Sequence, residues 1–300
     1  PTPSSHQVVY DAIRVGYRLF DGACDYGNEK EAGEGVRRAL EEGLSSAKNF
    51  VSRLYCHVSH SAKEAAKMQL KLWGLDYFDL FLVHFPIALA YVDPKHRYPP
   101  EWWADDGKSV SRTDLCHSED TPFQETWSAM EELVDEDFQS FPETIVSSNV
   151  TRALLVDILS YARITPQVLQ VEIHPYLTQE PLLEFTKTLG IAVTAYSSFG
   201  PQSYIELGFK GSVKPLFEQD PVVKAARAHQ KDLAQVLLRW ATQRGIAVIP
   251  KTTDTSRLVS NLDSTSFDLT EAEVEAISAL NIGLRLNNPS DIDPRLAIFE

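Results

Sequence analysis

The chain has 300 residues, of which 43% are hydrophobic and 23% charged, a composition typical of a globular protein with one large α/β barrel or two ordinary domains. The formal net charge of −14 argues against nucleic acid or an anionic membrane as a partner, because both require a basic surface. The first residues, PTPSSHQ, show no signal-peptide pattern, and no apolar run is long enough to span a bilayer.

Segments with strand and helix patterns alternate along the chain. The expected strands are short and apolar, several of them rich in β-branched residues, at 17–21, 49–55, 79–84, 143–148, 168–173, 192–197 and 246–250. Amphipathic segments predicted as helices lie between them, at 28–43, 62–74, 123–136, 151–163, 180–190 and 232–245. This alternation predicts an α/β fold, a (β/α)8 TIM barrel that occupies residues 1–300 as a single domain.

Two of the expected strands end beside residues with catalytic chemistry. The strand YRLFD is expected to break at Gly22, which places Asp21 and Tyr26 just past its end and before a helix that begins near Asn28. The segment DLFLVH places His84 at the end of another strand. In a parallel α/β barrel, the carboxyl ends of the strands form the rim where catalysis takes place. A carboxylate and a phenol at this rim suggest proton transfer by the phenol.

The segment 87–122, which follows directly on His84, has no periodicity and contains RYPPEWWADDGK. Loops of this length are uncommon unless they act as lids or binding loops. We therefore expect a long loop that covers the rim. The adjacent Trp102 and Trp103 favour an ordered loop over the alternative, a disordered insertion.

Five motifs, in order along almost the whole chain, resemble the aldo-keto reductases and in particular their fungal xylose reductase branch. These motifs are FDGACDYGNEKEAGEGV, DYFDLFLVHFP, LQVEIHPYL, TAYSSFGPQS and IPKTTDTSRLVSN. The resemblance implies a single α/β barrel and reduction of a carbonyl group by a nicotinamide cofactor.

The resemblance also implies an N-terminal hairpin and a first barrel strand ahead of the helix HQVVYDAIRVG. Only seven strands are expected here, and the chain begins almost at that helix. PTPSS cannot replace a central strand, because proline removes a donor from the ladder. We therefore expect the hairpin and the first strand to be absent. Either the natural N-terminus was lost or wrongly predicted, which we favour, or the barrel is incomplete and leaves two strand edges unpaired.

By resemblance, Tyr26 is the proton donor, Asp21 the supporting aspartate and His84 the residue that orients the carbonyl. The family's lysine, in S-K-L-W, is replaced by Arg53 in the S-R-L-Y of this chain. Arginine keeps the positive charge and can pair with Asp21, but its planar fork is bulkier and does not deprotonate. A misplacement of about 1 Å in a catalytic site can cost ~100-fold in rate. Arg53 therefore either weakens the proton donor or is a tolerated replacement.

The nicotinamide end of the cofactor site is implied by three of the motifs. Tyr196 would stack on the nicotinamide, and its carboxamide would be held by Gln170, Ser148 and Asn149. The loop after Tyr196 would wrap the pyrophosphate. Its residues are Ser197, Ser198, Gly200, Gln202 and Ser203.

The adenosine end of the cofactor site is expected in IPKTTDTSRLVSN, where a strand ends and a helix begins. Lys251, Thr252 and Arg257 would hold the 2′-phosphate together with backbone amides at the helix start, and Asn261 would contact the adenine. This arrangement favours NADPH, with NADH also possible.

The substrate end is expected in two places. Asn287 in IGLRLNN resembles the residue that binds a sugar hydroxyl in xylose reductases, and Phe85 would line the pocket. Residues 283–300 would form a tail on the substrate side. Val146 replaces a glycine of the family's G-V-S-N-F motif, at a position where backbone room matters.

The leading hypothesis is an NADPH-dependent reductase of an aldose, aldehyde or ketone, with a small-molecule carbonyl substrate, in a monomer or homodimer. Arg53 and the missing strand favour two alternatives: a non-redox isomerase or dehydratase of specialised metabolism, or a non-catalytic binding protein. The cysteines Cys24, Cys56 and Cys116 lack CxxC spacing. We therefore expect no disulfide framework, no metal site and a reducing, cytoplasmic location.

Overall fold

The computed structural model describes residues 4–44, 50–54, 62–89, 96, 122–135, 145–207 and 213–299. The side chains of residues 50–54 and 205–207 are outside this description. The chain divides into two compact units, one of Pro1–Leu169 with Pro289–Glu300 and the other of Gln170–Asn288. The expectation of a single domain over 1–300 stays a prediction.

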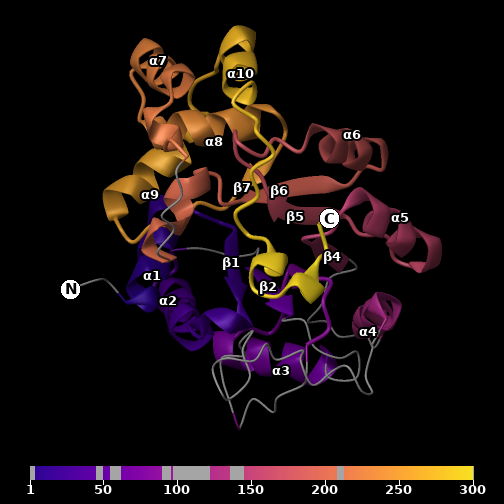
Figure 1. Ribbon diagram of the computed structural model, residues 1–300. Helices are drawn as coiled ribbons and strands as arrows, with labels where there is room; N and C mark the ends of the chain where they lie inside the picture. Colours follow the sequence, from indigo (N-terminus) through magenta and orange to yellow (C-terminus); the bar gives the residue numbers. More distant parts are fainter. Residues whose placement is uncertain are drawn as a thin grey trace. The chain divides into compact units, whose positions relative to one another are not determined.

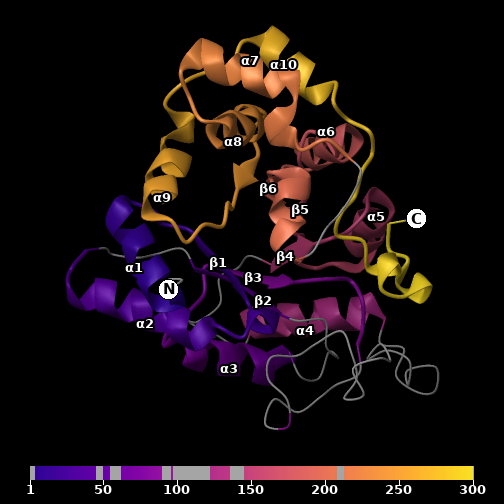
Figure 2. The same cartoon turned by 60° about the vertical axis from the view of Figure 1, so that its left-hand side comes forward.

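The first unit is a parallel sheet with helices between its strands. Its four full strands pair in chain order (Figure 1): β1 (Phe20–Ala23), β2 (Phe50–Leu54), β3 (Leu80–Val83) and β4 (Ile145–Ser148). Figure 2 shows α2, α3 and α4 along one side of these strands. The helices are α1 (Ser5–Val15), α2 (Glu29–Glu41), α3 (Ala62–Trp73), α4 (Phe123–Asp135) and α5 (Arg152–Tyr161).

Strand β1 does not break at Gly22, so that part of the prediction is wrong. The strand begins later than expected, at Phe20, and continues through Gly22 to Ala23. A Cβ at Gly22 would lie 2.4 Å from Cζ2 of Trp73, so the glycine is required by the indole packed against the strand. Asp21 consequently lies inside β1, opposite Val51 of β2, rather than past the strand end.

Helix α2 packs closely on its neighbours through two further glycines. A Cβ at Gly33 would lie 2.1 Å from the carbonyl oxygen of Trp73, and one at Gly35 would lie 2.3 Å from that of His6. The buried Trp73 also donates from Nε1 to Oε1 of Glu29, at 3.0 Å. This packing fixes the helix that follows Tyr26 and therefore the turn that carries it.

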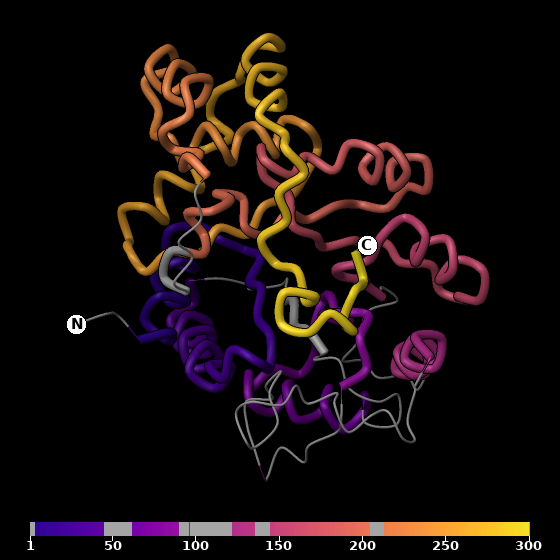
Figure 3. The backbone as a smooth tube through the Cα atoms, viewed as in Figure 1, coloured from indigo at the N-terminus to yellow at the C-terminus, as the bar shows by residue number. Residues whose placement is uncertain are grey.

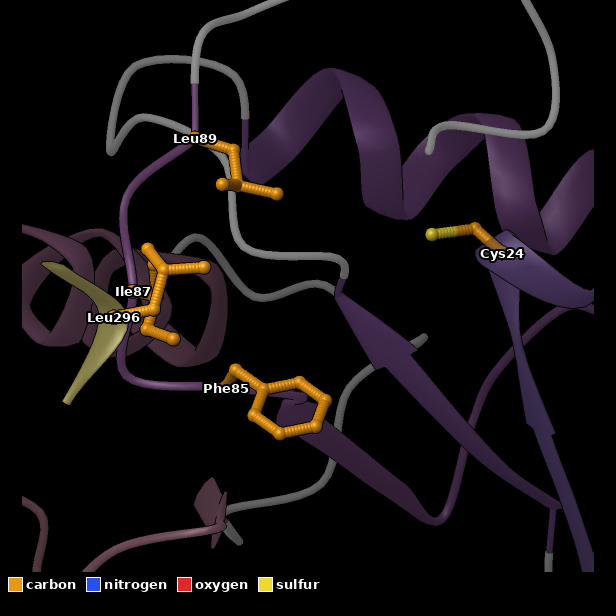
Figure 4. Packing of buried hydrophobic residues seen from close by; sticks show 5 residues of the cluster. All are labelled: Cys24, Phe85, Ile87, Leu89 and Leu296. Atoms are coloured by element: carbon orange, nitrogen blue, oxygen red, sulfur yellow. The ribbon is translucent and has the colours of Figure 1, made fainter. Parts of the chain in front are cut away.

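The end of the chain returns to the first unit. Leu296 packs with Phe85, Ile87, Leu89 and Cys24 in one buried cluster, which Figure 4 shows from close by. The backbone trace in Figure 3 shows the yellow C-terminal segment, which forms η7 (Pro289–Asp291) and η8 (Pro294–Leu296). The tail therefore contacts the segment that follows His84. Of the predicted long loop 87–122, only 87–89, 96 and 122 are among the described residues.

The second unit contains the remaining strands, again in chain order: β5 (Val168–Glu172), which begins in the first unit, β6 (Ala192–Tyr196) and β7 (Ala247–Val248). Strands β6 and β7 are parallel, with Thr194 opposite Ala247. The helices and longer turns are α6 (Glu180–Thr188), η4 (Gly200–Leu207), η5 (Leu216–Glu218), α7 (Asp220–His229), α8 (Leu233–Gln243), α9 (Thr255–Leu262) and α10 (Glu271–Ser278).

The seven expected strands are all present among the described residues, and six expected helices match α2 to α6 and α8. No strand precedes α1 within the described part, which begins at Ser4. Helices α7 and α10 were not expected. Their start signals are in the sequence, however: a proline in the first turn of α7, and a capping box of Thr270 and Glu273 in α10. None of the described helices is both long and apolar enough to cross a membrane.

Candidate active site

The first unit collects candidate residues at the carboxyl ends of its parallel strands. Strand β1 leads into the short turn η1 (Cys24–Tyr26), His84 follows β3, and Asn149 follows β4. Because the strands are parallel and adjacent in order, these residues lie at the same edge of the sheet.

Tyr26 and His84 are brought together at this edge. Their ring centroids are 6.3 Å apart and the rings are nearly perpendicular, at 88°. Tyr26 is 51% exposed, whereas His84 is 5% exposed. The phenol is therefore open to solvent, whereas the imidazole beside it is enclosed by protein.

Asp25 also faces this site, although the sequence did not lead us to expect it. Its Oδ1 lies 3.5 Å from Nδ1 of His84, and the two form an ion pair only when the imidazole is protonated. The signal was available, because Asp25 immediately precedes Tyr26 in the same turn. The family resemblance implied Asp21, not Asp25, as the supporting acid.

Arg53 can be placed only by its backbone. It pairs with Ala23 of β1 and Leu82 of β3, so it lies in the strand between the two that lead to Tyr26 and His84. Its side chain is outside the described residues, and its pairing with Asp21 stays a prediction.

Asn149, which follows β4, is hydrogen-bonded to the backbone of His84. Asn149 has a left-handed φ of 59°, and its Nδ2 donates to the carbonyl oxygen of His84 at 2.8 Å and to Oγ of Ser148 at 3.2 Å. Both Ser148 and Asn149 are 1% exposed. Positive φ in a residue other than glycine is costly and is concentrated at functional sites.

Two other predicted positions in this unit are buried. Val146, which replaces the family's glycine, is 0% exposed and packs against Leu82, so the sheet accommodates it. Phe85 is 4% exposed, and its ring centroid lies 5.0 Å from that of His84. Its role as a wall of the substrate pocket stays a prediction.

In the second unit, Tyr196 ends β6 and its hydroxyl accepts a hydrogen bond from Nδ2 of Asn287, at 3.3 Å. Its enclosure by protein raises the pKa of Tyr196 well above its usual value, and the negative charge of Glu172 adds to the effect. The phenol therefore stays protonated and neutral at ordinary pH. A hydrogen bond thus connects Tyr196, the candidate for stacking on the nicotinamide, with Asn287, the candidate for binding the substrate.

The loop after Tyr196 turns sharply. Ser197 has a φ of 53°, and its hydroxyl donates to that of Tyr204 at 2.8 Å. A Cβ at Gly200 would lie 2.8 Å from Cδ1 of Leu216. The other candidates differ in exposure: Gln170 on β5 and Ser198 are buried, Gln202 is half-buried and Ser203 is exposed.

The adenosine candidates lie between β7 and α9, as predicted. Lys251 and Arg257 are exposed, Thr252 is half-buried and Asn261 is 7% exposed.

The expected contribution of backbone amides at this helix start to the 2′-phosphate site stays a prediction, because two of these amides already have a partner. Oδ1 of Asp254 already accepts from the backbone nitrogens of Ser256, at 2.8 Å, and Arg257, at 3.3 Å. Several hydrogen bonds lower the pKa of Asp254, and the bond from the Ser256 hydroxyl contributes most. The carboxylate of Asp254 is therefore charged. This capping role was not among the sequence predictions, although Asp is a preferred N-cap.

The described residues contain no group of three or more His, Cys, Asp or Glu side chains that could hold a metal ion. A buried pair, Glu172 and His174, was also missed. Its sequence signal was a charged residue in a mostly apolar strand, VLQVEI.

Comparison with known proteins places these observations in a family. Residues 1–282 match the aldo/keto reductase family. The chain is 52% identical over 297 residues to a probable NAD(P)H-dependent D-xylose reductase of Arthroderma otae, covering 97% of this chain and 88% of that protein. It is 51% identical over 298 residues to the protein of the same description in Emericella nidulans, covering 97% and 90%.

Solved structures agree with the sequence matches. A Bombyx mori aldo-keto reductase in complex with NADP has a TM-score of 0.81 and 32% identity, over 95% of this chain and 85% of that one. The aldose reductase from Schistosoma japonicum has a TM-score of 0.80 and 29% identity, over 96% and 87%. The expected α/β-barrel fold class and the family resemblance are confirmed.

Proposed function

The chain belongs to the aldo/keto reductase family, and we propose that it reduces the carbonyl group of an aldose, aldehyde or ketone to an alcohol, with NADPH as the hydride donor. The observation that carries the proposal is the pairing of a half-exposed Tyr26 with a buried His84 at the ends of parallel strands. The xylose reductases that resemble the chain make an aldose the first substrate to test.

Proton transfer is assigned to Tyr26. When bound, the nicotinamide supplies a hydride to the carbonyl carbon, and the oxygen that gains negative charge needs a proton. The Tyr26 hydroxyl donates it, and the adjacent His84 orients the carbonyl oxygen. His84 keeps its place because Asn149 holds its carbonyl oxygen and Asp25 faces its ring.

The chain's residues fit a nicotinamide cofactor. Ser198, in the loop expected to wrap the pyrophosphate, has a buried hydroxyl that has no hydrogen-bond partner among the described residues. A buried hydroxyl of this kind needs a partner, which a phosphate oxygen would supply. In this proposal Gln170, Ser148 and Asn149 hold the carboxamide and Tyr196 stacks on the ring.

NADPH is proposed as the preferred cofactor and NADH as a weaker one. The exposed Lys251 and Arg257 supply two positive charges for the 2′-phosphate. Asp254, between them in sequence, holds a negative charge at the start of α9 and opposes the phosphate. The low cysteine count supports a reducing compartment, and we place the enzyme in the cytoplasm.

Arg53 is the observation that favours a second candidate function. Without the compact ammonium of a lysine, Tyr26 and His84 could instead act as acid and base in a non-redox isomerisation or dehydration. Such an enzyme would keep the fold and the two rings but would not consume NADPH.

The test has two stages. NADPH is titrated into the purified protein by fluorescence, and NADPH consumption is then followed with xylose, simple aldehydes and ketones. Binding followed by turnover of at least one carbonyl supports the proposal. Binding without turnover of any compound in the panel would reject it and favour the non-redox alternative.

A further inference from the structure

We propose that Glu172 is a positioning residue that holds Asn287 in place for a substrate hydroxyl. This inference rests on the proposed function, in which Asn287 binds the substrate. Glu172 is the last residue of β5 and is 0% exposed, so its carboxylate has been removed from water entirely. A buried carboxylate is stable only when donors surround it.

Three nitrogens lie within hydrogen-bond distance of the Glu172 carboxylate. Oε1 accepts from the backbone nitrogen of Leu286, at 2.9 Å, and lies 2.8 Å from Nε2 of His174. Oε2 accepts from the backbone nitrogen of Asn287, also at 2.9 Å. Hydrogen bonds to two successive backbone groups fix both the position and the direction of that segment.

Asn287 is consequently held at two points. Glu172 binds its backbone nitrogen, and the neutral hydroxyl of Tyr196 accepts from its side-chain Nδ2, at 3.3 Å. The segment after α10 passes the carboxyl ends of β5 and β6, which carry these two partners (Figure 1). Asn287, the substrate candidate, is therefore hydrogen-bonded both to Glu172 and to the nicotinamide candidate Tyr196.

The charge of Glu172 is matched locally. Burial lowers the pKa of Arg285, and the attraction of Glu172 opposes that shift, so the two charges interact. His174 is also 0% exposed, and its ring nitrogen lies against the carboxylate. These partners make the carboxylate a fixed anchor for the segment that precedes and includes Asn287.

The substitution Glu172→Gln tests this role, because glutamine keeps the shape but replaces one acceptor oxygen with a donor. One backbone N–H of the Leu286–Asn287 pair would then face an amide donor. KM for xylose should rise roughly three- to tenfold, the effect of one lost hydrogen bond. KM and kcat for a short aliphatic aldehyde without hydroxyls should change less than twofold, as expected for an effect transmitted through Asn287.

Glu131→Gln is the matched control. Glu131 is also a buried glutamate, and its Oε1 accepts from two successive backbone nitrogens, those of Arg163 at 2.7 Å and Ile164 at 2.9 Å. It lies in the first unit and outside the proposed site. Its substitution should lower the melting temperature and leave the ratio of the two KM values unchanged.

A double-mutant cycle separates positioning from general damage. Glu172→Gln should raise the KM for xylose in the unmodified protein but have no further effect once Asn287→Ala is present. An equal effect on both backgrounds, or an equal rise for both substrates, would overturn the proposal. If the Gln variant does not fold, Glu172→Asp replaces it, because its shorter side chain keeps the charge but loses reach to Leu286 and Asn287.

Amide hydrogen exchange tests the anchor without any activity. In Glu172→Gln, a peptide containing 285–287 should exchange at least tenfold faster than in the unmodified protein, whereas Glu131→Gln should leave it unchanged. Unchanged exchange in Glu172→Gln would reject the anchor. If the unmodified protein reduces no carbonyl, the proposed function fails, and this measurement still decides whether Glu172 holds the segment.

Discussion

The two units of the chain hold their candidate residues in different ways. In the first, Tyr26 is half exposed and contacts His84 through a ring-to-ring approach. In the second, a buried carboxylate, two backbone amides and a phenol join Glu172, Asn287 and Tyr196 in a continuous set of hydrogen bonds. The departures from the family's pattern, Arg53 and Val146, are both in the first unit. The proposed proton donor Tyr26 is in the first unit and the proposed 2′-phosphate residues are in the second, so single substitutions can test the two roles separately.

Tyr26→Phe should have the largest effect of any single substitution in either unit. Removing the hydroxyl removes the proton donor, and general acid catalysis contributes roughly 10²- to 10⁴-fold. We expect kcat to fall by about that amount while the Kd for NADPH, measured by fluorescence titration, is unchanged.

The control for Tyr26→Phe is Tyr161→Phe, which also removes a tyrosine hydroxyl from the first unit. Tyr161 is the last residue of α5, the helix that leads back from the end of β4 to the start of β5, so loss of its hydroxyl should leave kcat unchanged. Retention of full activity in Tyr26→Phe would disprove the assignment of the proton donor.

Arg53→Lys should raise carbonyl reduction, by up to ~100-fold if the guanidinium misplaces the catalytic groups. A compact ammonium near the phenol favours loss of the proton better than a planar fork does. The pH profile of kcat should move as well, which is measured with xylose and simple aldehydes across a range of pH.

Arg14→Lys, at an exposed position of α1, is the matched control for Arg53→Lys. Absence of a gain at any pH would count against a reductase weakened by Arg53. High activity of the unmodified protein would show instead that the arginine is tolerated.

Arg257→Ala should weaken NADPH binding by about 1–3 kcal/mol and leave NADH binding nearly unchanged, because only NADPH has the 2′-phosphate. Separate titrations with the two cofactors provide the measurement. Arg227→Ala, in α7, removes the same charge from another exposed position. Equal weakening for both cofactors would contradict the phosphate assignment.

Asp254→Asn should have the smallest effect, a few-fold rise in the preference for NADPH over NADH. Asparagine still caps α9, so the helix start is kept while the negative charge that opposes the phosphate is removed. The ratio of the two Kd values measures the change. A fall in that preference would show that the Asp254 carboxylate helps to hold the cofactor instead of opposing it.

The sequence by itself determined the order of elements and most of the candidate positions. The spacing of apolar residues predicted seven strands and six of the helices, because the periods of helix and strand are set by bonds within a few residues. The placement of Tyr26, His84 and Asn149 after strand ends followed from that order, since parallel strands bring their carboxyl ends to one edge. The N-cap Asp254 was equally local and could have been predicted.

Only the tertiary structure decided which distant residues meet. Residue 22, inside β1, has to be a glycine because the indole of Trp73 occupies the space where a side chain would be. Nothing in YRLFDG indicates that neighbour. Glu172 meets Asn287 across 115 positions of sequence. Such contacts depend on where the backbone passes after every intervening element has packed. Local propensity is short-ranged, so it cannot specify them.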